Sequence, residues 1–206
     1  MTSRIDSIDW NESYIQKDAP WDSGEVSPEF RSRFVEWKID SFSHPRVLDI
    51  GCGSGTNAIH LAKHQFHVTA CDLSPEAISL AKRKAQDSSV CVEWMCADFL
   101  THDWRCPPFP LLIDRGCYHI LRHVNLNRFL TVLDQLTHKG SLFFVLTGNS
   151  HQTGEEGPPK VSAEELCQEL GQVLHLKDLR EFRFSKVRIG DRETNPLGWS
   201  SVWEKH

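Results

Sequence analysis

Three alternating glycines and two aspartates carry the most informative chemistry of this chain. Gly51, Gly53 and Gly55 follow an apolar stretch and lead directly into a helical pattern. Glycines at this spacing permit positive φ at a tight bend and let a ligand touch the backbone. Asp49 stands two residues before the first glycine, and Asp72 follows at the end of the next expected strand. A carboxylate there can accept hydrogen bonds from both hydroxyls of an adenosine ribose. The pattern therefore predicts a turn that binds a nucleotide cofactor.

The glycine spacing distinguishes two classes of cofactor. The dinucleotide fingerprint G-x-G-x-x-G requires a third glycine where this chain has Thr56. The pattern here is G-x-G-x-G, and the acidic Asp49 ahead of it suits a ligand with an ammonium group and repels a diphosphate. It resembles the glycine-rich motif of the class I S-adenosylmethionine-dependent methyltransferases. The resemblance implies S-adenosyl-L-methionine as cofactor, bound by Asp49, Gly51, Gly53, Gly55, Asp72 and Leu73. A nicotinamide-dependent oxidoreductase and a non-catalytic protein that senses the cofactor are the alternatives from other classes.

Aromatic residues near the N-terminus carry a second resemblance. Trp10, Tyr14 and the segment Ala-Pro-Trp-Asp-Ser-Gly at 19–24 are similar to the lead-in W-x3-W/Y-x6-P-W-D-x-G of the thiopurine S-methyltransferase-like family. That family includes halide and thiol methyltransferases, and its aromatics close over the cofactor. The resemblance implies this role for Trp10, Tyr14 and Trp21, since aromatic faces attract a sulfonium cation and exclude water. The alternative is that these rings pack an amphipathic N-terminal helix onto the sheet.

A long loop after the fifth expected strand extends the resemblance. Residues 148–161 contain Gly157-Pro-Pro159, which is similar to a Gly-Pro-Pro element at this place in the same family. Loops at the carboxyl edge of a parallel sheet face the ligand crevice, so this loop and its His151 are expected on the substrate side. Asp49 departs from the halide methyltransferases, where proline is frequent at that position. This departure puts a halide substrate in doubt but leaves the cofactor unaffected.

Two residues after the third expected strand are candidates for the adenine site. Asp98 and Phe99 occupy the place where the wider methyltransferase family contacts adenine. The resemblance implies a carboxylate that accepts from the exocyclic amine and a ring that stacks on the base. The alternative is a capping aspartate beside a core phenylalanine.

A cluster of reactive side chains follows the fourth expected strand. Because that strand borders the switch point of the sheet, this segment should line the floor where methyl group and acceptor meet. We assign Asp114 to the cofactor and Cys117, Tyr118 and His119 to the acceptor, with His119 as general base. The alternative is a structural Asp114–Arg115 ion pair with His119 as a packing residue.

Strand and helix signals alternate along the chain, as a doubly wound sheet requires. The fold class expected is α/β, Rossmann-like, with a mostly parallel seven-stranded sheet and an antiparallel C-terminal hairpin. Residues 1–206 are expected to form one methyltransferase domain. Within it, 1–35 cover the cofactor, 46–147 form the cofactor-binding core, and 148–161 form the substrate-side loop. After the strand that enters the glycine loop, strands are expected at 67–72, 90–95, 110–114, 141–147, 176–183 and 199–204, and helices at 56–64, 75–86, 126–136 and 163–174.

Composition narrows the function classes further. Lys and Arg number 23 against 28 Asp and Glu, a net charge of −5 without a basic block, which argues against a nucleic-acid partner. Seven scattered cysteines, an odd number, fit reduced thiols better than a disulfide framework, and no cluster has zinc spacing. Neither a signal peptide nor a stretch long enough to span a bilayer stands out, so the expectation is a cytoplasmic protein without a membrane partner.

The activity expected is in-line transfer of a methyl group from S-adenosylmethionine to a small nucleophile, such as a thiol, a thiolate or a related soft anion. Displacement from a sulfonium is chemically easy, so catalysis would depend on proximity, alignment and desolvation. O- or N-methylation of a small metabolite, with His119 as base, is the alternative within the class. The sequence leaves the acceptor and the oligomeric state open.

Overall fold

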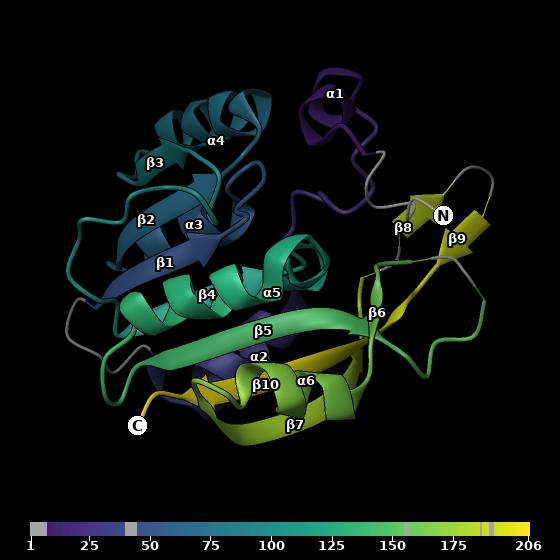
Figure 1. Ribbon diagram of the computed structural model, residues 1–206. Coiled ribbons are helices and arrows are strands. Elements are labelled where there is room, and N and C mark those ends of the chain that lie inside the picture. The colour runs from purple at the N-terminus through teal and green to yellow at the C-terminus, as the bar shows by residue number, and fades with distance from the viewer. Residues whose placement is uncertain (1–7, 40–44, 155–156, 186, 190–191) are drawn as a thin grey trace.

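A mixed sheet of eight strands forms the centre of the computed structural model (Figure 1), which describes residues 8–39, 45–154, 157–185, 187–189 and 192–206. Seven strands lie in the order β3-β2-β1-β4-β5-β10-β7, and β6 pairs with β5. The strands are β1 (Arg46–Ile50), β2 (His67–Asp72), β3 (Glu93–Cys96), β4 (Leu111–Arg115), β5 (Leu142–Asn149), β6 (Lys160–Val161), β7 (His175–Arg183) and β10 (Leu197–Glu204).

The direction of the strands confirms the expected fold class. The pairs β3–β2, β2–β1, β1–β4 and β4–β5 are parallel, whereas β10 runs antiparallel to both β5 and β7. The sheet is therefore Rossmann-like, mostly parallel, and extended by antiparallel C-terminal strands. A separate two-stranded pair, β8 (Val187–Ile189) and β9 (Arg192–Thr194), lies outside this sheet.

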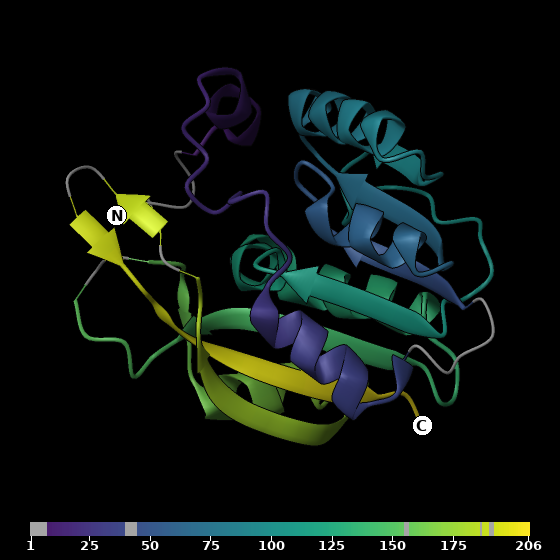
Figure 2. The same ribbon diagram turned by 180° about the vertical axis from the view of Figure 1, so that it is seen from behind.

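Helices cover both faces of the sheet. They are α1 (Trp10–Ile15), α2 (Pro28–Glu36), α3 (Thr56–Lys63), α4 (Pro75–Asp87), α5 (Tyr118–Gln135) and α6 (Ala163–Leu170). In Figure 1, α5 and α6 lie in front of the sheet, whereas Figure 2 shows α2 and α3 on the opposite face. Alternate strand residues supply the two cores, because successive side chains of a strand point to opposite faces. Leu48 of β1 belongs to the core with α5 and α6, and Val47 to the core with α2 and α3.

The parallel strands place the candidate residues along one edge of the sheet. The glycine loop follows β1, Asp72 ends β2, and Arg115 ends β4. Helix α1 lies beyond this carboxyl edge (Figure 1). Residues 1–7 of the expected cofactor-covering segment and 155–156 of the expected substrate-side loop fall outside the described residues.

The structure corrects several expected boundaries. Helix α5 begins at Tyr118 instead of 126, because the carboxylate of Asp114 accepts hydrogen bonds from the backbone N–H groups at the start of that helix. Asn125 has a non-helical backbone (φ −163°, ψ 88°) and divides α5, and the second part corresponds to the helix expected at 126–136. Strand β3 starts three residues later than expected, since a turn with positive φ at Ser89 follows α4. Strands β6, β8 and β9 were not predicted.

In the described part of the chain, no helix combines the length and the apolar character that crossing a membrane would require.

Candidate functional site

The glycine loop has the left-handed backbone that its sequence predicts. The φ angles of Gly51, Gly53 and Gly55 are +64°, +54° and +79°. A Cβ on Gly51 would lie 2.6 Å from the Cβ of Cys117, and one on Gly53 would lie 2.5 Å from the hydroxyl oxygen of Tyr14. A side chain on either glycine would therefore be strained by the backbone and blocked by a neighbour.

Asp72 organises the backbone next to this loop. One carboxylate oxygen accepts a hydrogen bond from the Gly53 N–H and the other from the Ser74 N–H, both at 2.8 Å. Burial raises the pKa of Asp72, and the two backbone donors oppose that shift. Each carboxylate oxygen has a second lone pair. Asp72 therefore keeps accepting capacity toward a hydroxyl-bearing ligand, and the adjacent Leu73 exposes 58% of its surface.

Asp49 has an unpartnered carboxyl oxygen at the start of the loop. Its side chain is buried and accepts from the Ala58 N–H, but its Oδ2 has no hydrogen-bond partner. Burial raises the pKa of Asp49 well above its usual range, and the carboxylates of Asp114 and Asp72 raise it further. A buried acceptor without a partner is costly. An ammonium group of a ligand would relieve that cost, so this position fits the amino-acid end of S-adenosylmethionine.

Arg115 is a half-buried cation that the sequence analysis considered as the partner of Asp114 in an ion pair. Its guanidinium donates from Nη1 to the carbonyl of Trp21 at 2.9 Å and stands 5.6 Å from the ring centre of Phe184. Its Nε is buried without a partner. Asp49 pairs in register with Ile113, two residues before Arg115, so Asp49 and Arg115 stand on one face of adjacent strands. The described residues thus place an unpartnered carboxyl oxygen and an unpartnered guanidinium N–H on the same face of the sheet.

The N-terminal aromatics form a cluster beside the glycine loop. The rings of Trp10 and Trp21 meet edge to face at 5.2 Å, and Trp21 Nε1 donates to the Tyr14 hydroxyl at 3.3 Å. Asn11 Oδ1 accepts from the Ser74 hydroxyl and the Glu76 N–H at the start of α4, which fastens α1 to the edge of the sheet. These contacts place the aromatic cluster where it would cover a ligand on the loop.

Asp114 occupies a different position from the one expected. Both of its oxygens are used by backbone donors, from Gly116 at 3.0 Å, Cys117 at 2.9 Å and Tyr118 at 2.8 Å. The side chain is fully buried, and burial raises its pKa to about 7 against the effect of these donors. Asp114 therefore caps α5, and its cofactor contact remains a prediction, which the full burial of the side chain disfavours. No ion pair to Arg115 occurs among the described residues either.

Tyr118 also departs from its expected role. It is fully buried, its hydroxyl donates to Glu169 Oε2 at 2.7 Å, and its ring packs on Phe129. Glu169 also accepts three hydrogen bonds from the Arg122 guanidinium, which joins α5 to α6. Because α5 begins at residue 118, the Tyr118 side chain turns toward α6. This placement favours a structural role for Tyr118, and its acceptor contact remains a prediction.

His119 lies near the carboxyl edge but is a weak base. The ring is buried, and its Nδ1 accepts from the Gly148 N–H at 3.3 Å. Burial lowers the pKa of His119 to about 3, with a smaller effect from the charges of His123 and Arg115. The imidazole is therefore neutral, and a base of such low pKa removes protons inefficiently near neutral pH. This placement favours the packing alternative.

Four further candidate residues differ in burial and in their contacts. Phe99 is buried against Trp104 and Phe129, so its ring has no open face for a base. Asp98 accepts from the Leu100 N–H at 2.8 Å, which makes it a local cap. Cys117 is half-buried beside Gly51, and burial raises its pKa well above the usual range.

The side chain of His151, the fourth candidate, is exposed, and its Nδ1 lies 2.7 Å from Glu181 Oε1. Its ring centre stands 5.5 Å from that of Trp199, a residue of β10. His151 therefore lies at the outer rim of the sheet's carboxyl edge.

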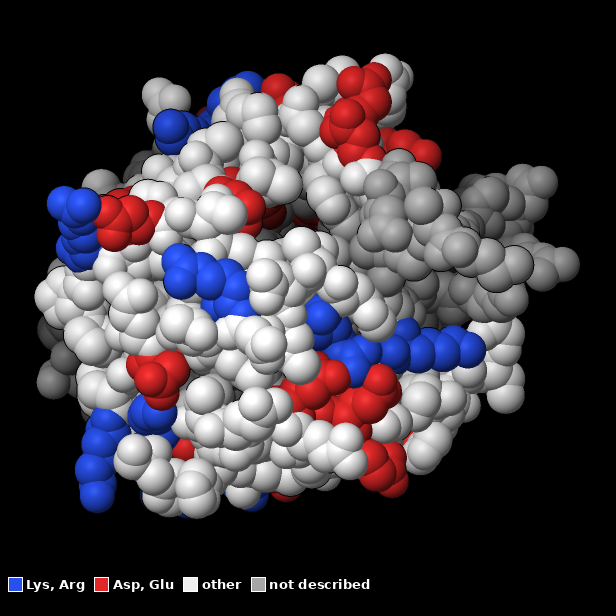
Figure 3. Space-filling model, in the orientation of Figure 1, with Lys and Arg blue, Asp and Glu red and all other residues white. Residues whose placement is uncertain are grey.

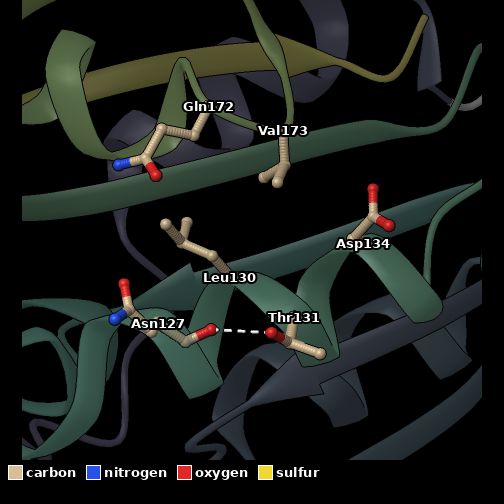
Figure 4. A pocket seen from close by; sticks show the side chains of 6 residues that line it. All are labelled: Asn127, Leu130, Thr131, Asp134, Gln172 and Val173. Atoms are coloured by element: carbon tan, nitrogen blue, oxygen red, sulfur yellow. Dashed lines mark hydrogen bonds between the residues drawn. The ribbon is translucent and has the colours of Figure 1, made fainter.

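The pocket shown in Figure 4 is separate from this site. It has a volume of about 480 Å³ and lies between α5 and the turn after α6. Its lining consists of Asn127, Leu130, Thr131, Asp134, Gln172 and Val173, none of which belongs to the glycine loop or its neighbours. Among the described residues, no group of three or more His, Cys, Asp or Glu side chains could hold a metal ion.

Known proteins resemble this chain in sequence and fold. Residues 47–140 match the family described as "Methyltransferase domain". The ubiquinone biosynthesis O-methyltransferases of Coxiella burnetii and Xylella fastidiosa are 33% identical over 96 and 101 residues, or 46% and 40% of this chain. These alignments cover 38% and 39% of the relatives, so the chain spans less than two fifths of the curated relatives it matches.

Solved structures share the fold over nearly the whole chain. One, described as "Conversion of a Disulfide Bond into a Thioacetal Group during Echinomycin Biosynthesis", has a TM-score of 0.77 at 23% identity and covers 94% of this chain and 91% of its own. Magnesium protoporphyrin IX methyltransferase from Synechocystis PCC 6803 has a TM-score of 0.65 at 15% identity, with coverage of 86% and 82%. Residues 47–140 therefore match a methyltransferase domain, and this segment contains the glycine loop, Asp72 and Arg115.

Proposed function

We propose that this chain transfers the methyl group of S-adenosylmethionine to a small acceptor whose nucleophilic atom needs no strong base, with a thiol as the first candidate. The observation that carries the cofactor assignment is the unsatisfied oxygen of Asp49 beside a glycine loop with three positive φ angles. In this proposal residues 46–147 form the cofactor-binding core, 1–35 cover the cofactor, and 148–161 face the acceptor.

Each end of the cofactor has a candidate partner in the site. Asp49 would accept from the ammonium group, Arg115 would donate to the carboxylate, and Asp72 would accept from the ribose hydroxyls. Leu73, Asp98 and the backbone of the glycine loop remain proposed contacts toward the nucleoside. The chemistry that S-adenosylmethionine supplies when bound is an electrophilic methyl group on a sulfonium.

The aromatic residues would shield the reacting centre. Trp10, Tyr14 and Trp21 form one cluster beside Gly53, and their ring faces would attract a sulfonium while they exclude water. Alignment and desolvation would then supply most of the rate enhancement.

The low basicity of His119 supports an acceptor that is nucleophilic without help from the enzyme. A thiol ionises in part near neutral pH, and its thiolate is strongly nucleophilic. Cys117 and His151 remain the proposed neighbours of the acceptor. The structural resemblance to a protein described by the conversion of a disulfide bond into a thioacetal group is in keeping with a sulfur acceptor.

O-methylation of a small phenol is the second candidate. It is supported by the local sequence similarity to ubiquinone biosynthesis O-methyltransferases. A phenol has a higher pKa than most thiols, so its methylation would need a base, which His119 supplies poorly.

The test is a panel of small thiols, phenols, amines, halides and selenium or tellurium anions, scored by release of S-adenosylhomocysteine. We expect turnover with thiols that rises with pH as the acceptor ionises. Turnover with phenols alone would favour the second candidate, and absence of S-adenosylhomocysteine binding in calorimetry would overturn the methyltransferase proposal.

A further inference from the structure

His119 has one ring nitrogen that is fixed as a hydrogen-bond acceptor. The Gly148 N–H donates to its Nδ1 at 3.3 Å, so this nitrogen offers its lone pair and carries no proton. Burial lowers the pKa of His119 to about 3, so the ring is neutral near neutral pH. A neutral imidazole carries one proton, which therefore lies on Nε2. Nε2 is thus a donor, and in the described part of the chain no hydrogen bond engages it.

This donor lies against the turn that joins β4 to α5. A Cβ on Gly116 would lie 3.4 Å from Nε2 and 3.3 Å from Cε1 of His119, so the missing side chain leaves this edge of the ring uncovered. The next residue of the turn, Cys117, contacts the glycine loop, because its Cβ lies 2.6 Å from the point where a Cβ on Gly51 would stand. The free N–H of His119 therefore adjoins the turn that touches the proposed cofactor loop.

The charges that act on His119 are positive. Those of His123, Arg115 and Arg122 each disfavour a further proton on the ring, although Arg122 is itself paired with carboxylates of α6. Figure 3 shows a hollow in the middle of this face, with acidic side chains at its upper edge and Lys or Arg side chains below it, over α5. A potential that opposes an imidazolium favours an anion beside the ring. A hydrogen bond to an anion is also stronger than one to a neutral atom.

We propose that His119 donates from Nε2 to the nucleophilic atom of the acceptor and so selects the thiolate over the neutral thiol. The proposal rests on the methyltransferase function proposed above and adds the ionisation state in which the acceptor binds. The proton of the thiol passes to solvent before transfer. A lone pair of the thiolate sulfur then forms the bond to the methyl carbon, while the S–CH₃ bond of the cofactor breaks and leaves its electron pair on the cofactor sulfur.

The first experiment locates the proton on the ring without any ligand. In the full chain labelled with ¹⁵N at histidine, long-range ¹⁵N–¹H correlation spectra distinguish protonated from unprotonated ring nitrogens. We expect His119 to have a protonated Nε2 and an unprotonated Nδ1 at every pH between about 5 and 8. His119→Gln, which lacks these signals, assigns them. A proton on Nδ1, or an imidazolium within this range, overturns the proposal.

The second experiment compares an anionic and a neutral sulfur ligand by calorimetry, with the protein saturated with S-adenosylhomocysteine. Thiophenol above its pKa supplies a thiolate, and thioanisole, its methylated form, supplies a neutral sulfur on the same ring. We expect the parent to bind thiophenolate more tightly. His119→Leu should lower that affinity by roughly tenfold and change the affinity for thioanisole by less than about twofold. His119→Gln should keep most of the preference, because its amide can accept from Gly148 and donate from Nε2.

His138→Leu is the matched control, because His138 is exposed and follows the far end of α5, so both affinities should stay unchanged. Equal losses for both sulfur ligands in His119→Leu would show that the ring only fills space. A loss in His119→Gln as large as in His119→Leu would show that its donor is irrelevant. Either result, or a failure of thiophenolate to bind the parent, overturns the thiolate proposal and leaves the methyltransferase proposal standing. If S-adenosylhomocysteine does not bind the parent, both proposals fail.

Discussion

The hydroxyl oxygen of Tyr14 lies 2.5 Å from the point where a Cβ on Gly53 would stand. Helix α1 and the glycine loop therefore share a contact surface that has no room for a methyl group. The contact joins a residue of the N-terminal segment to the turn after β1, which makes the position of α1 sensitive to the loop.

Gly53→Ala should destabilise the protein and displace α1. The substitution combines a backbone cost at φ +54° with a clash against Tyr14, so we expect a loss of about 1–3 kcal/mol in the free energy of unfolding. Denaturant titration and hydrogen exchange over residues 10–16 measure both effects. Gly140→Ala is the matched control, because Gly140 has φ +85° but no neighbour within 4 Å of a Cβ. Equal losses in the two variants would contradict a steric contribution from Tyr14.

Asp72→Asn should weaken cofactor binding. The Asp72 carboxylate oxygens accept from backbone N–H groups and retain lone pairs that could accept from ribose hydroxyls. Hydrogen bonds to a charged group contribute roughly 1.5–3 kcal/mol to the free energy of binding. We expect the affinity for S-adenosylhomocysteine to fall by roughly 10- to 100-fold in calorimetric titration. Asp87→Asn, at the far end of α4, should bind as the parent does. Tight binding of NAD by the parent would argue for the oxidoreductase alternative.

Arg115→Gln should affect only ligands that carry a carboxylate. We expect S-adenosylhomocysteine to bind roughly tenfold more weakly and 5′-methylthioadenosine, which lacks the amino-acid end, to bind unchanged. Arg115 also donates to the Trp21 carbonyl and so supports the backbone of the covering segment. Comparing the two ligands distinguishes this support from a direct contact between Arg115 and the ligand carboxylate. A similar loss for both ligands would assign Arg115 to holding the covering segment.

His119→Gln should change how stability depends on pH. The pKa of His119 is about 3 in the folded protein and about 6.5 in the unfolded chain, so the unfolded chain binds the additional proton between these values. The free energy of unfolding of the parent therefore falls as pH decreases from about 6.5 toward 3, by up to about 1.4 kcal/mol per pH unit from this group. Denaturant unfolding between pH 4 and 7 should show a smaller slope in the variant. Parallel curves would mean that His119 binds protons equally in the folded and unfolded states, so that burial does not lower its pKa.

The same variant also tests His119 as a base. Since the folded-state pKa is about 3, we expect kcat/KM to fall by the same factor for an acceptor that must lose a proton and for one already anionic. A selective loss for the protonated acceptor, with a matching change in the pH profile, would restore the general-base role.

Local patterns in the sequence determined the cofactor turn and most of the sheet. The alternation of Gly51, Gly53 and Gly55 predicts positive φ because only glycine adopts it without strain, and all three angles are positive. The helix expected at 163–174 begins at a capping box of Ser162 and Glu165, a local signal because both partners lie within one helical turn. The doubly wound fold followed from the alternation of such local signals.

Tertiary structure decided what the polar residues after β4 do. Asp114 caps α5, Tyr118 bonds Glu169 51 residues away, and the ring of His119 accepts from the Gly148 backbone. The partners of Tyr118 and His119 lie far away in the sequence, and the role of Asp114 depends on where α5 begins. The unsatisfied groups of Asp49 and Arg115 are likewise visible only once the strands are paired. Residue type and spacing specify which chemistry is available, but burial and long-range hydrogen bonds determine which side chains remain free to perform it.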